Sequence, residues 1–493
     1  MSRPSTDAVV IGAGPNGLAA AVTLARAGLE VHVLEAQQVP GGGARTLDSD
    51  LAEGLRYDVC SAVHALALAS PFFRQFDLAA RGVELAVPEV SYAQPLEGGW
   101  AAVAYRSLER TASELGDDGG AWRDLFAPLV ENSGLLTELI LGNRRELPPG
   151  LLGGSGLQAA AQAAWRLLEQ GTPAWQQRFT GQEAPALFTG VAAHAISTLP
   201  SLAAAGTSLM LATHAHVGGW PIPVGGSGAI TAALIADLEA RGGQVHTGAE
   251  VNAWHDLPRA RTYVADVTPS ALVRIWGERM KPSVREGLAR FRYGDAAAKV
   301  DYVLSGPVPW ADERMRTAGT VHVGGARAEM AAAEAQVAAG VVPERPMALF
   351  SDPALHDPSR EVGGLRPGWA YAHVPANCPV DITEHVTAQI ERFAPGFRDL
   401  VVASRCIPAN EMSEHNANYV GGDIAAGAMS AWGMLARPRP TTNPYAAGIP
   451  GVYLCSQSTP PGPGVHGMSG WHAARMALHQ RFGLPEPSLA PGA

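Results

Sequence analysis

The sequence predicts an α/β protein with two sheets, one parallel and starting at the N-terminus, the other further along the chain with antiparallel strands. Three observations predict this class. An apolar strand, a glycine turn and an alanine-rich helix follow one another within the first 35 residues. The same order returns near the other end of the chain, in residues 451–478. Between them, residues 299–304 and 369–374 alternate in the manner of antiparallel strands.

Composition excludes several classes of protein. The chain has 493 residues, and its 36 Lys and Arg against 46 Asp and Glu give a net charge of −10, which argues against nucleic-acid binding. With 47% hydrophobic residues it can build a large core in two or three domain-sized units, so a disordered or fibrous protein is excluded. The N-terminus lacks the features of a secretory signal, so we expect a cytoplasmic protein.

The four cysteines lie far apart in the sequence. None forms a CxxC pair, and neither a zinc site nor a disulfide framework is expected. A dithiol reductase is therefore disfavoured, and no metal is expected. The cysteines are Cys60, Cys378, Cys406 and Cys455.

The N-terminal glycine turn has the spacing of a dinucleotide-binding unit. Gly12 permits the tight turn, Gly14 lets a pyrophosphate approach the backbone, and Gly17 lets the helix pack closely on the sheet. The amides at the start of the helix then bind the phosphates. Glu35 ends the second strand at a distance suited to a ribose hydroxyl, and it disfavours a 2′-phosphate. Strand, helix and acid fall in register, which favours a ligand over an empty turn.

A long stretch in the middle of the chain, residues 184–236, contains no Asp, Glu, Lys or Arg. Prolines, glycines and histidines interrupt it, so a membrane span is not expected. We favour a buried pair of helices over a substrate tunnel or a membrane-dipping surface. The buried helices and a substrate site are compatible if the substrate is a lipid. Ser227 is expected to cap a helix over 229–241, and Asp381 with Glu384 to form a capping box.

The C-terminal region repeats the order of strand, glycine loop and helix. Residues 451–455 are expected to form a strand, 458–464 a Pro/Gly loop, and 468–478 a helix. Read alone, this is an ordinary strand-to-helix turn. An NAD dehydrogenase has no need of it, whereas a flavin, with its ring deep in the protein, is commonly held from both chain ends.

Together, six segments resemble the phytoene desaturase-like carotenoid/retinoid oxidoreductases. The branch most similar is the pyridine nucleotide-disulfide oxidoreductase domain-containing protein 2 group. The resemblance spans nearly the whole chain, and its pair of end motifs is specific for FAD. The segments are 7–35, 41–46, 57–64, 219–227, 416–423 and 455–468.

The resemblance implies a glutathione-reductase-type FAD-binding Rossmann domain joined to a mixed-sheet α+β substrate domain. The FAD-binding domain is expected to be noncontiguous, in residues 1–75, 215–280 and 405–493. Residues 76–214 and 281–404 would form the substrate domain. The chain departs from the pattern of many flavoproteins at Ser456 and Gln457, where an acid often contacts the ribityl chain.

The glycine turn and the resemblance together imply the residues that hold FAD. Residues 41–45 would lie along the pyrophosphate, Val251 would touch the adenine through its backbone, and residues 465–468 would sit under the flavin pyrimidine. The full set is Gly12, Gly14, Pro15, Asn16, Gly17, Glu35, Ala36, Gly42, Gly43, Ala44, Arg45, Val251, Gly464, Val465, His466, Gly467 and Met468.

Three residues are candidates for acid/base catalysis. His466 comes first, because its loop resembles the part that touches the isoalloxazine ring, and a histidine there could accept a substrate proton near neutral pH. The alternative is a histidine bonded to a backbone carbonyl that only fixes the loop. His64 and Tyr419 follow, and His64 could equally be a satisfied buried group.

The function expected is that of an FAD-dependent oxidoreductase acting on an apolar, isoprenoid or fatty-acyl substrate. Its reaction would be C–C desaturation or flavin-dependent double-bond isomerisation. A flavin amine oxidase acting on a small amine, and a prenyl- or lipid-binding protein without redox activity, stay open. The partners expected are an apolar small molecule and an unidentified electron acceptor, without nucleic acid. Peripheral membrane contact and a homodimer also stay open.

Overall fold

The first sheet is built from five strands that lie far apart in the sequence. In the computed structural model, which describes residues 6–492, all five run parallel in the order β16-β10-β1-β2-β9. The first five residues, part of the N-terminal stretch considered above, lie outside the described residues. The strands are β1 (Thr6–Ile11), β2 (Val31–Leu34), β9 (Gln244–His246), β10 (Ala260–Ala265) and β16 (Val452–Leu454).

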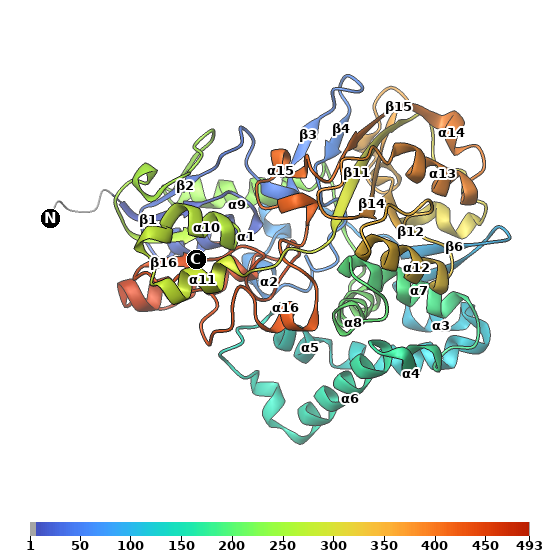
Figure 1. Ribbon diagram of the computed structural model, residues 1–493, viewed down its shortest axis with the longest axis horizontal. Coiled ribbons are helices and arrows are strands. Elements are labelled where there is room, and N and C mark those ends of the chain that lie inside the picture. The colour runs from blue at the N-terminus through green and yellow to red at the C-terminus, as the bar shows by residue number, and fades with distance from the viewer. Residues whose placement is uncertain (1–5, 493) are drawn as a thin grey trace.

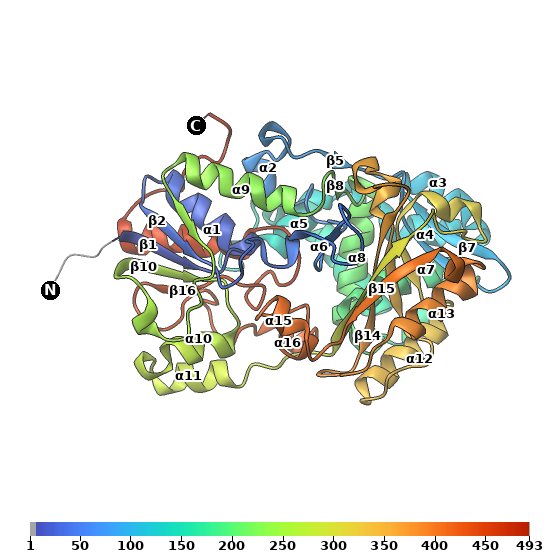
Figure 2. The same ribbon diagram turned by 90° about the horizontal axis from the view of Figure 1, so that it is seen from above.

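Helices cover both faces of this sheet. Alternate residues of β1 divide between two cores: Ala8 and Val10 pack against one set of helices, Val9 and Ile11 against the other. Figure 2 shows α1 and α9 on one side of the sheet and α10 and α11 on the other. The helices are α1 (Pro15–Arg26), α2 (Pro71–Phe76), α9 (Gly228–Ala240), α10 (Pro269–Trp276), α11 (Pro282–Ala289) and α17 (Met468–Ala477).

The second sheet has seven strands and is mixed. Its order is β15-β11-β14-β13-β12-β6-β7, and only β12 and β6 pair in parallel. The antiparallel pairing of residues 299–304 with 366–371 confirms the strands expected there. The strands are β6 (Val90–Leu96), β7 (Trp100–Tyr105), β11 (Ala296–Leu304), β12 (Ala318–Val323), β13 (Ala348–Ser351), β14 (Arg366–Val374) and β15 (Val401–Ile407).

Helices pack on both faces of the second sheet as well (Figure 1). Side chains of α13 and α14 fill the core on one face, and those of α4, α7, α8 and α12 lie on the other. The helices are α3 (Leu108–Glu114), α4 (Gly119–Glu131), α5 (Ser133–Leu141), α6 (Gly154–Gln170), α7 (Glu183–Ala192), α8 (Leu202–Val217), α12 (Arg327–Ala338), α13 (Thr383–Phe393) and α14 (Phe397–Leu400).

Short elements complete the structure between the two sheets. Two small antiparallel pairs form there, and two short helices lie in the segment that leads to the C-terminal motif. The pairs are β3 (Thr46–Asp48) with β4 (Arg56–Asp58), and β5 (Leu85–Ala86) with β8 (Ile222–Pro223). The helices are α15 (Met412–His415) and α16 (Ala431–Leu435).

The uncharged stretch forms two buried helices, as favoured from the sequence. Most side chains of α7 and α8 are buried against the second sheet and α4. Among the described residues, no helix is both long enough and apolar enough to cross a membrane.

Two expected caps are wrong. Ser227 precedes α9, but its hydroxyl donates to the Ser61 carbonyl and bonds the His64 ring instead of capping the helix. Asp381 accepts from the Thr383 amide, and no capping box with Glu384 forms. In both places a nearby alternative partner satisfies the side chain.

Candidate functional site

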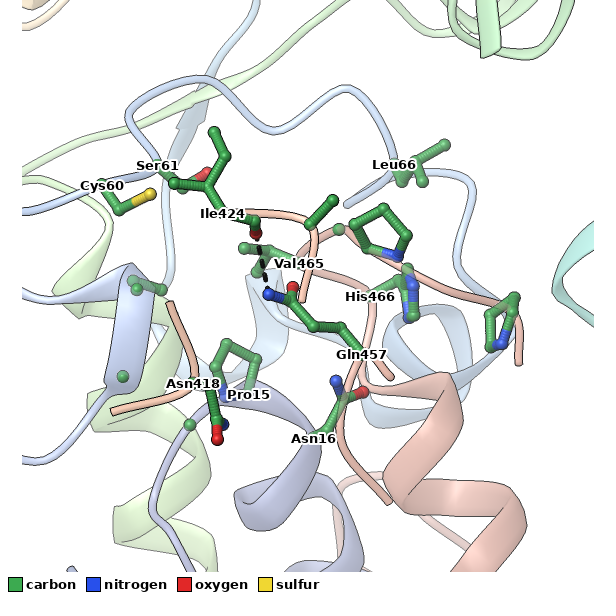
Figure 3. A pocket seen from close by; sticks show the side chains of 18 of the residues that line it. Pro15, Asn16, Cys60, Ser61, Leu66, Asn418, Ile424, Gln457, Val465 and His466 are labelled. Carbon is green, nitrogen blue, oxygen red and sulfur yellow. Dashed lines mark hydrogen bonds between the residues drawn. The ribbon is translucent and has the colours of Figure 1, made fainter. Parts of the chain in front are cut away.

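A cavity of about 1070 Å³ lies between the two sheets and draws its walls from both. One end is formed by the turn after β1, the end of β2 and the C-terminal loop. The other end reaches α5, α8 and strands β12, β13 and β14. Figure 3 shows residues of the first end, with Asn16 and Pro15 at the start of α1 below Gln457 and Val465. A ligand could therefore extend from the glycine turn into the second sheet's side of the cavity.

The glycine turn approaches Asp266 so closely that side chains are excluded. Gly12 has φ +91°, and a Cβ there would lie 2.9 Å from the Asp266 carbonyl oxygen. A Cβ on Gly14 would lie 2.8 Å from the Asp266 carboxylate, and one on Gly17 would overlap the Gly12 carbonyl. Gly14 precedes α1 and has no side chain to cap it, and of the amides in the first turn that of Gly17 is bonded to the Asp266 carboxylate.

Glu35 ends β2 and is fixed by backbone amides. One carboxylate oxygen accepts from the Ala13 amide at 2.7 Å, and the other accepts from the Gln37 amide at 2.8 Å. A carboxylate offers four lone-pair positions, so each oxygen can still accept from a ribose hydroxyl. Ala36 and Val251 line the cavity beside it.

Asp266 is a site residue that the sequence analysis missed. Its carboxylate accepts from the Gly17 amide at 2.9 Å, and its carbonyl accepts from the Asn418 amide group at 3.0 Å. Burial, with a smaller contribution from the nearby charge of Glu35, raises the pKa of this carboxyl to about 7, although the hydrogen bond from Gly17 acts in the opposite direction. Its position directly after β10 was the signal available in the sequence, because the carboxyl ends of parallel strands lie along one edge of the sheet, where the glycine turn also lies.

The segment after β2 adds a second loop to the cradle. A Cβ on Gly42 would lie 2.9 Å from the Gly14 Cα, so the two loops touch. Gly42, Gly43 and Ala44 line the cavity. Arg45 does not: its guanidinium donates to the Gly42 carbonyl at 2.8 Å and to the His415 carbonyl, and so it braces the loop from behind.

The C-terminal loop supplies the opposite wall. Gly464, Val465 and His466 line the cavity. Gly467 has φ +69°, and a Cβ there would lie 2.7 Å from the Phe72 ring. Gly467 and Met468, like Gly17, lie behind the cavity and not on its surface.

The His466 ring is held by the backbone of its own loop. One ring nitrogen, Nε2, lies 3.2 Å from the Gly462 carbonyl, and Nδ1 accepts from the Met468 amide at 3.1 Å. This requires the neutral Nε2–H tautomer, and burial lowers the pKa of the ring to about 4. The geometry corresponds to the loop-fixing alternative, because neither nitrogen is left for a substrate.

His64 and Tyr419 lie on the same cavity. The Nε2 atom of His64 is 2.8 Å from the Ser227 hydroxyl, whereas Nδ1 is buried without a partner among the described residues. Burial lowers the pKa of His64 to about 4. Burial raises the pKa of Tyr419, and a Cβ on Gly43 would overlap the Tyr419 hydroxyl.

Two polar side chains, those of Asn16 and Gln457, also line the dinucleotide end of the cavity. The side-chain oxygen of Asn16 is buried and has no partner among the described residues. Gln457, which replaces the acid common in flavoproteins, donates to the Ile424 carbonyl at 2.8 Å (Figure 3). In the described part of the chain, no group of three His, Cys, Asp or Glu side chains could hold a metal ion. The open cradle at Gly14 and Gly42 and the unsatisfied Asn16 oxygen fit a dinucleotide.

Comparison with known sequences agrees with this geometry. Residues 10–76 match the model of the NAD(P)-binding Rossmann-like domain. Pyridine nucleotide-disulfide oxidoreductase domain-containing protein 2 of Rattus norvegicus is 24% identical, over 97% of this chain and 94% of its own. The chain is homologous to that protein and carries an NAD(P)-binding Rossmann-like domain.

Other relatives fit the same conclusion. An uncharacterised protein of Mycobacterium tuberculosis (strain H37Rv) is 27% identical, over 96% of this chain and 97% of its own. Hydroxyneurosporene desaturase of Cereibacter sphaeroides is 63% identical over 41 residues, which are 8% of each chain. That likeness is therefore limited to one short segment.

Solved structures share the fold. An oxidoreductase from Methanosarcina mazei has a TM-score of 0.58 at 16% identity, over 95% of this chain and 99% of its own. A redesigned putrescine oxidase has a TM-score of 0.60 at 16% identity, over 96% of this chain and 98% of its own. The α/β fold with a Rossmann-like domain and a mixed sheet, expected from the sequence, is confirmed.

Proposed function

We propose that this chain is an FAD-dependent oxidoreductase that acts on an apolar, isoprenoid- or fatty-acyl-like substrate. Its reaction would be C–C desaturation or flavin-dependent double-bond isomerisation. One observation carries the proposal: a single cavity joins the dinucleotide cradle to a chamber lined mainly by apolar side chains. Apolar members of its walls include Leu167, Leu202, Met210, Leu211, Trp220, Leu349, Met429 and Met434.

The residues that would hold FAD come from both ends of the chain. The start of α1 and residues 42–44 would face the phosphates, Glu35 a ribose, and Val251 the adenine. The loop at 464–466 would lie by the ring. When bound, a flavin accepts a hydride and leaves the protein to position the substrate and exclude water. The neutral form of Asp266 would reduce the repulsion between this carboxyl and the phosphates.

The apolar walls would bind and orient the substrate, because burying its hydrocarbon surface supplies the binding energy. Of the three acid/base candidates, His64 is the histidine with an unpartnered ring nitrogen. We place proton transfer there before Tyr419, and assign His466 to holding the loop next to the ring.

An amine oxidase is the second candidate. The putrescine oxidase likeness favours it, and so does an aromatic pair on the cavity wall, Trp369 and Tyr371, whose ring centroids are 5.3 Å apart. A lipid-binding protein without flavin is the third candidate and predicts a colourless protein.

An absorbance spectrum tests the proposal. Purified protein should show flavin bands between about 300 and 600 nm that bleach on anaerobic photoreduction and then respond to an apolar lipid extract. Bleaching by amines with release of peroxide would instead establish the amine oxidase. A protein that stays colourless after incubation with FAD would overturn the enzyme proposal.

The cavity mouth supports a proposal of peripheral membrane contact. Leu147 and Leu435 line the cavity and are 70% and 76% exposed. Arg144 donates to the Leu435 carbonyl at 3.3 Å and so joins the loop after α5 to α16. Leu152, Trp165 and Trp432 are also largely exposed on the neighbouring segments. Figure 1 shows α5, α6 and α16 along one side of the molecule. We propose that this side touches a lipid surface, from which an apolar substrate enters.

A further inference from the structure

The wall of the cavity formed by the second sheet carries polar groups that the proposed reaction does not use. His194 follows α7, and Thr320 and Trp369 lie on β12 and β14; all three line the cavity. His322, two residues beyond Thr320 on β12, lies directly behind His194. These four residues are here called the sheet-side polar group.

His194 and His322 form a direct ring-to-ring contact. Their Nε2 atoms are 2.9 Å apart, and the rings meet edge to face. Trp220 packs edge-on against His194, with ring centroids 5.8 Å apart. Gly190 leaves the space for this arrangement, because a Cβ there would lie 2.9 Å from His322 Nδ1. His194 is therefore held in one orientation at the cavity surface.

The contact decides what His194 can offer a ligand. Burial lowers the pKa of His194 to about 3 and that of His322 well below its ordinary value, so both rings are neutral. One ring must then donate its Nε2 proton and the other must accept it. His194 Nδ1, which has no partner among the described residues, is thus an acceptor in one tautomer pair and a donor in the other. A hydroxyl can therefore bond this nitrogen in either tautomer pair, and a carbonyl oxygen can accept from it when it carries the proton.

Two further residues of the cavity lining carry buried polar atoms without a partner in the described part of the chain. Thr320 is 3% exposed and Trp369 is 8% exposed, yet the Thr320 hydroxyl and the Trp369 indole nitrogen have no partner among the described residues. Buried polar atoms are nearly always satisfied, by protein, water or ligand. Together with the free nitrogen of His194, two such atoms on residues of the same cavity lining indicate a ligand that carries a polar group.

The charge of the wall indicates what kind of polar group it is. Within the described residues, the acids that line the cavity lie elsewhere: Glu35, Glu250 and Asp266 at the dinucleotide end, and Glu138 and Glu146 on α5 and the loop after it. The arginines of the lining, Arg144 and Arg274, also lie outside the second sheet. With no charge to pair, an ammonium or a carboxylate would be desolvated at a cost.

We propose that His194, oriented by His322 and joined by Thr320, binds a hydroxyl or carbonyl oxygen of an otherwise apolar substrate. This inference rests on the proposed function and narrows its substrate class to a neutral oxygenated hydrocarbon. The histidine contact sets the orientation of the substrate in the cavity, and the rest of the hydrocarbon extends along the apolar walls toward the cradle.

Titration calorimetry on the FAD-loaded protein tests the inference with three probes that share one ten-carbon isoprenoid skeleton: geraniol, geranylamine and 2,6-dimethylocta-2,6-diene. We expect geraniol to bind at least about tenfold more tightly than the hydrocarbon, because the hydrocarbon leaves the polar atoms unpaired. In His194→Phe the affinity for geraniol should fall to that of the hydrocarbon, whose own affinity changes little.

Thr320→Val is nearly isosteric and keeps the test valid if His194→Phe does not fold. In this variant the difference in affinity between geraniol and the hydrocarbon should become smaller. His356→Phe changes a histidine of the same domain that lies outside the cavity, and should leave the difference unchanged. Equal binding of geraniol and hydrocarbon in the wild type, or a difference preserved in both cavity variants, would overturn the subsite. Tighter binding of geranylamine than of geraniol would overturn the proposal that the subsite binds a neutral group. If the flavin is bound and no probe binds, the apolar-substrate proposal itself fails.

Discussion

The carboxylate of Asp266 accepts a hydrogen bond from the Gly17 amide at 2.9 Å, so a residue at the end of β10 is bonded within the first turn of α1. The two residues are 249 positions apart in the sequence. Their contact places a second acid, besides Glu35, at the cradle proposed for the phosphates of the cofactor.

Asp266→Asn should change how stability depends on pH. The pKa of Asp266 is raised from 3.8 to about 7, so the folded state holds a proton that the unfolded state has released. Stability therefore falls as pH rises from about 4 to 7, by on the order of 4 kcal/mol for this group. The asparagine keeps the acceptor for Gly17 and should remove this loss. Urea unfolding of the apo-protein at several pH values between 5 and 8 measures it. If the free energy of unfolding depends on pH equally in the wild type and in the variant, the raised pKa of Asp266 is contradicted.

Gly14→Ala should abolish tight FAD binding without unfolding the chain. Its backbone conformation is open to alanine, but the new Cβ would lie 2.8 Å from the Asp266 carboxylate, inside the cradle. We expect the affinity for FAD to fall at least about tenfold, measured by quenching of flavin fluorescence. Gly120→Ala, on α4 with nothing near the added Cβ, is the matched control and should bind FAD normally. Tight binding by the Gly14 variant would place the cofactor elsewhere.

Gly43→Ala should destabilise the protein through Tyr419. The added Cβ would overlap the Tyr419 hydroxyl, whereas the ring carbon that bears the hydroxyl would lie 3.4 Å away. Overpacking of this kind costs about 1–3 kcal/mol. The double variant with Tyr419→Phe should recover most of this loss in thermal unfolding, because phenylalanine lacks the overlapping oxygen. Strictly additive effects would contradict the predicted contact.

Leu147→Glu combined with Leu435→Glu should remove membrane contact. Both leucines are exposed at the cavity mouth, and charges there would oppose insertion into a lipid surface. In flotation with phosphatidylcholine vesicles, the wild type should be recovered in the lipid fraction and the double variant in the unbound fraction. Val402→Glu, at an exposed apolar position on β15, is the control and should float with the vesicles like the wild type. Flotation of the double variant would refute the proposed face.

The local order of elements could be predicted from the sequence, because each depends on residues close together in the chain. The strand, turn and helix around Gly12 and Gly14, and the repeat ending in α17, were expected and are present. The contact of Asp266 with Gly17 depends on which strands become neighbours, which periodicity does not reveal. The contact of His194 with His322 joins a helix end to a strand for the same reason. Ser227 was misread because a hydroxyl before a helix can bond any close acceptor, and here Ser61 and His64 are closer.

The sheet order has a consequence for biosynthesis. The central strand β1 is made first, yet its neighbour β10 and the edge strand β16 leave the ribosome much later. α17 packs so closely on α1 that a Cβ on Gly470 would overlap the Asn16 carbonyl. The cradle proposed for the cofactor is therefore completed only after residues 464–466 have been translated, so under the proposed function FAD would load after these residues have been made. A nascent chain stalled before residue 452 holds the glycine turn without its final wall.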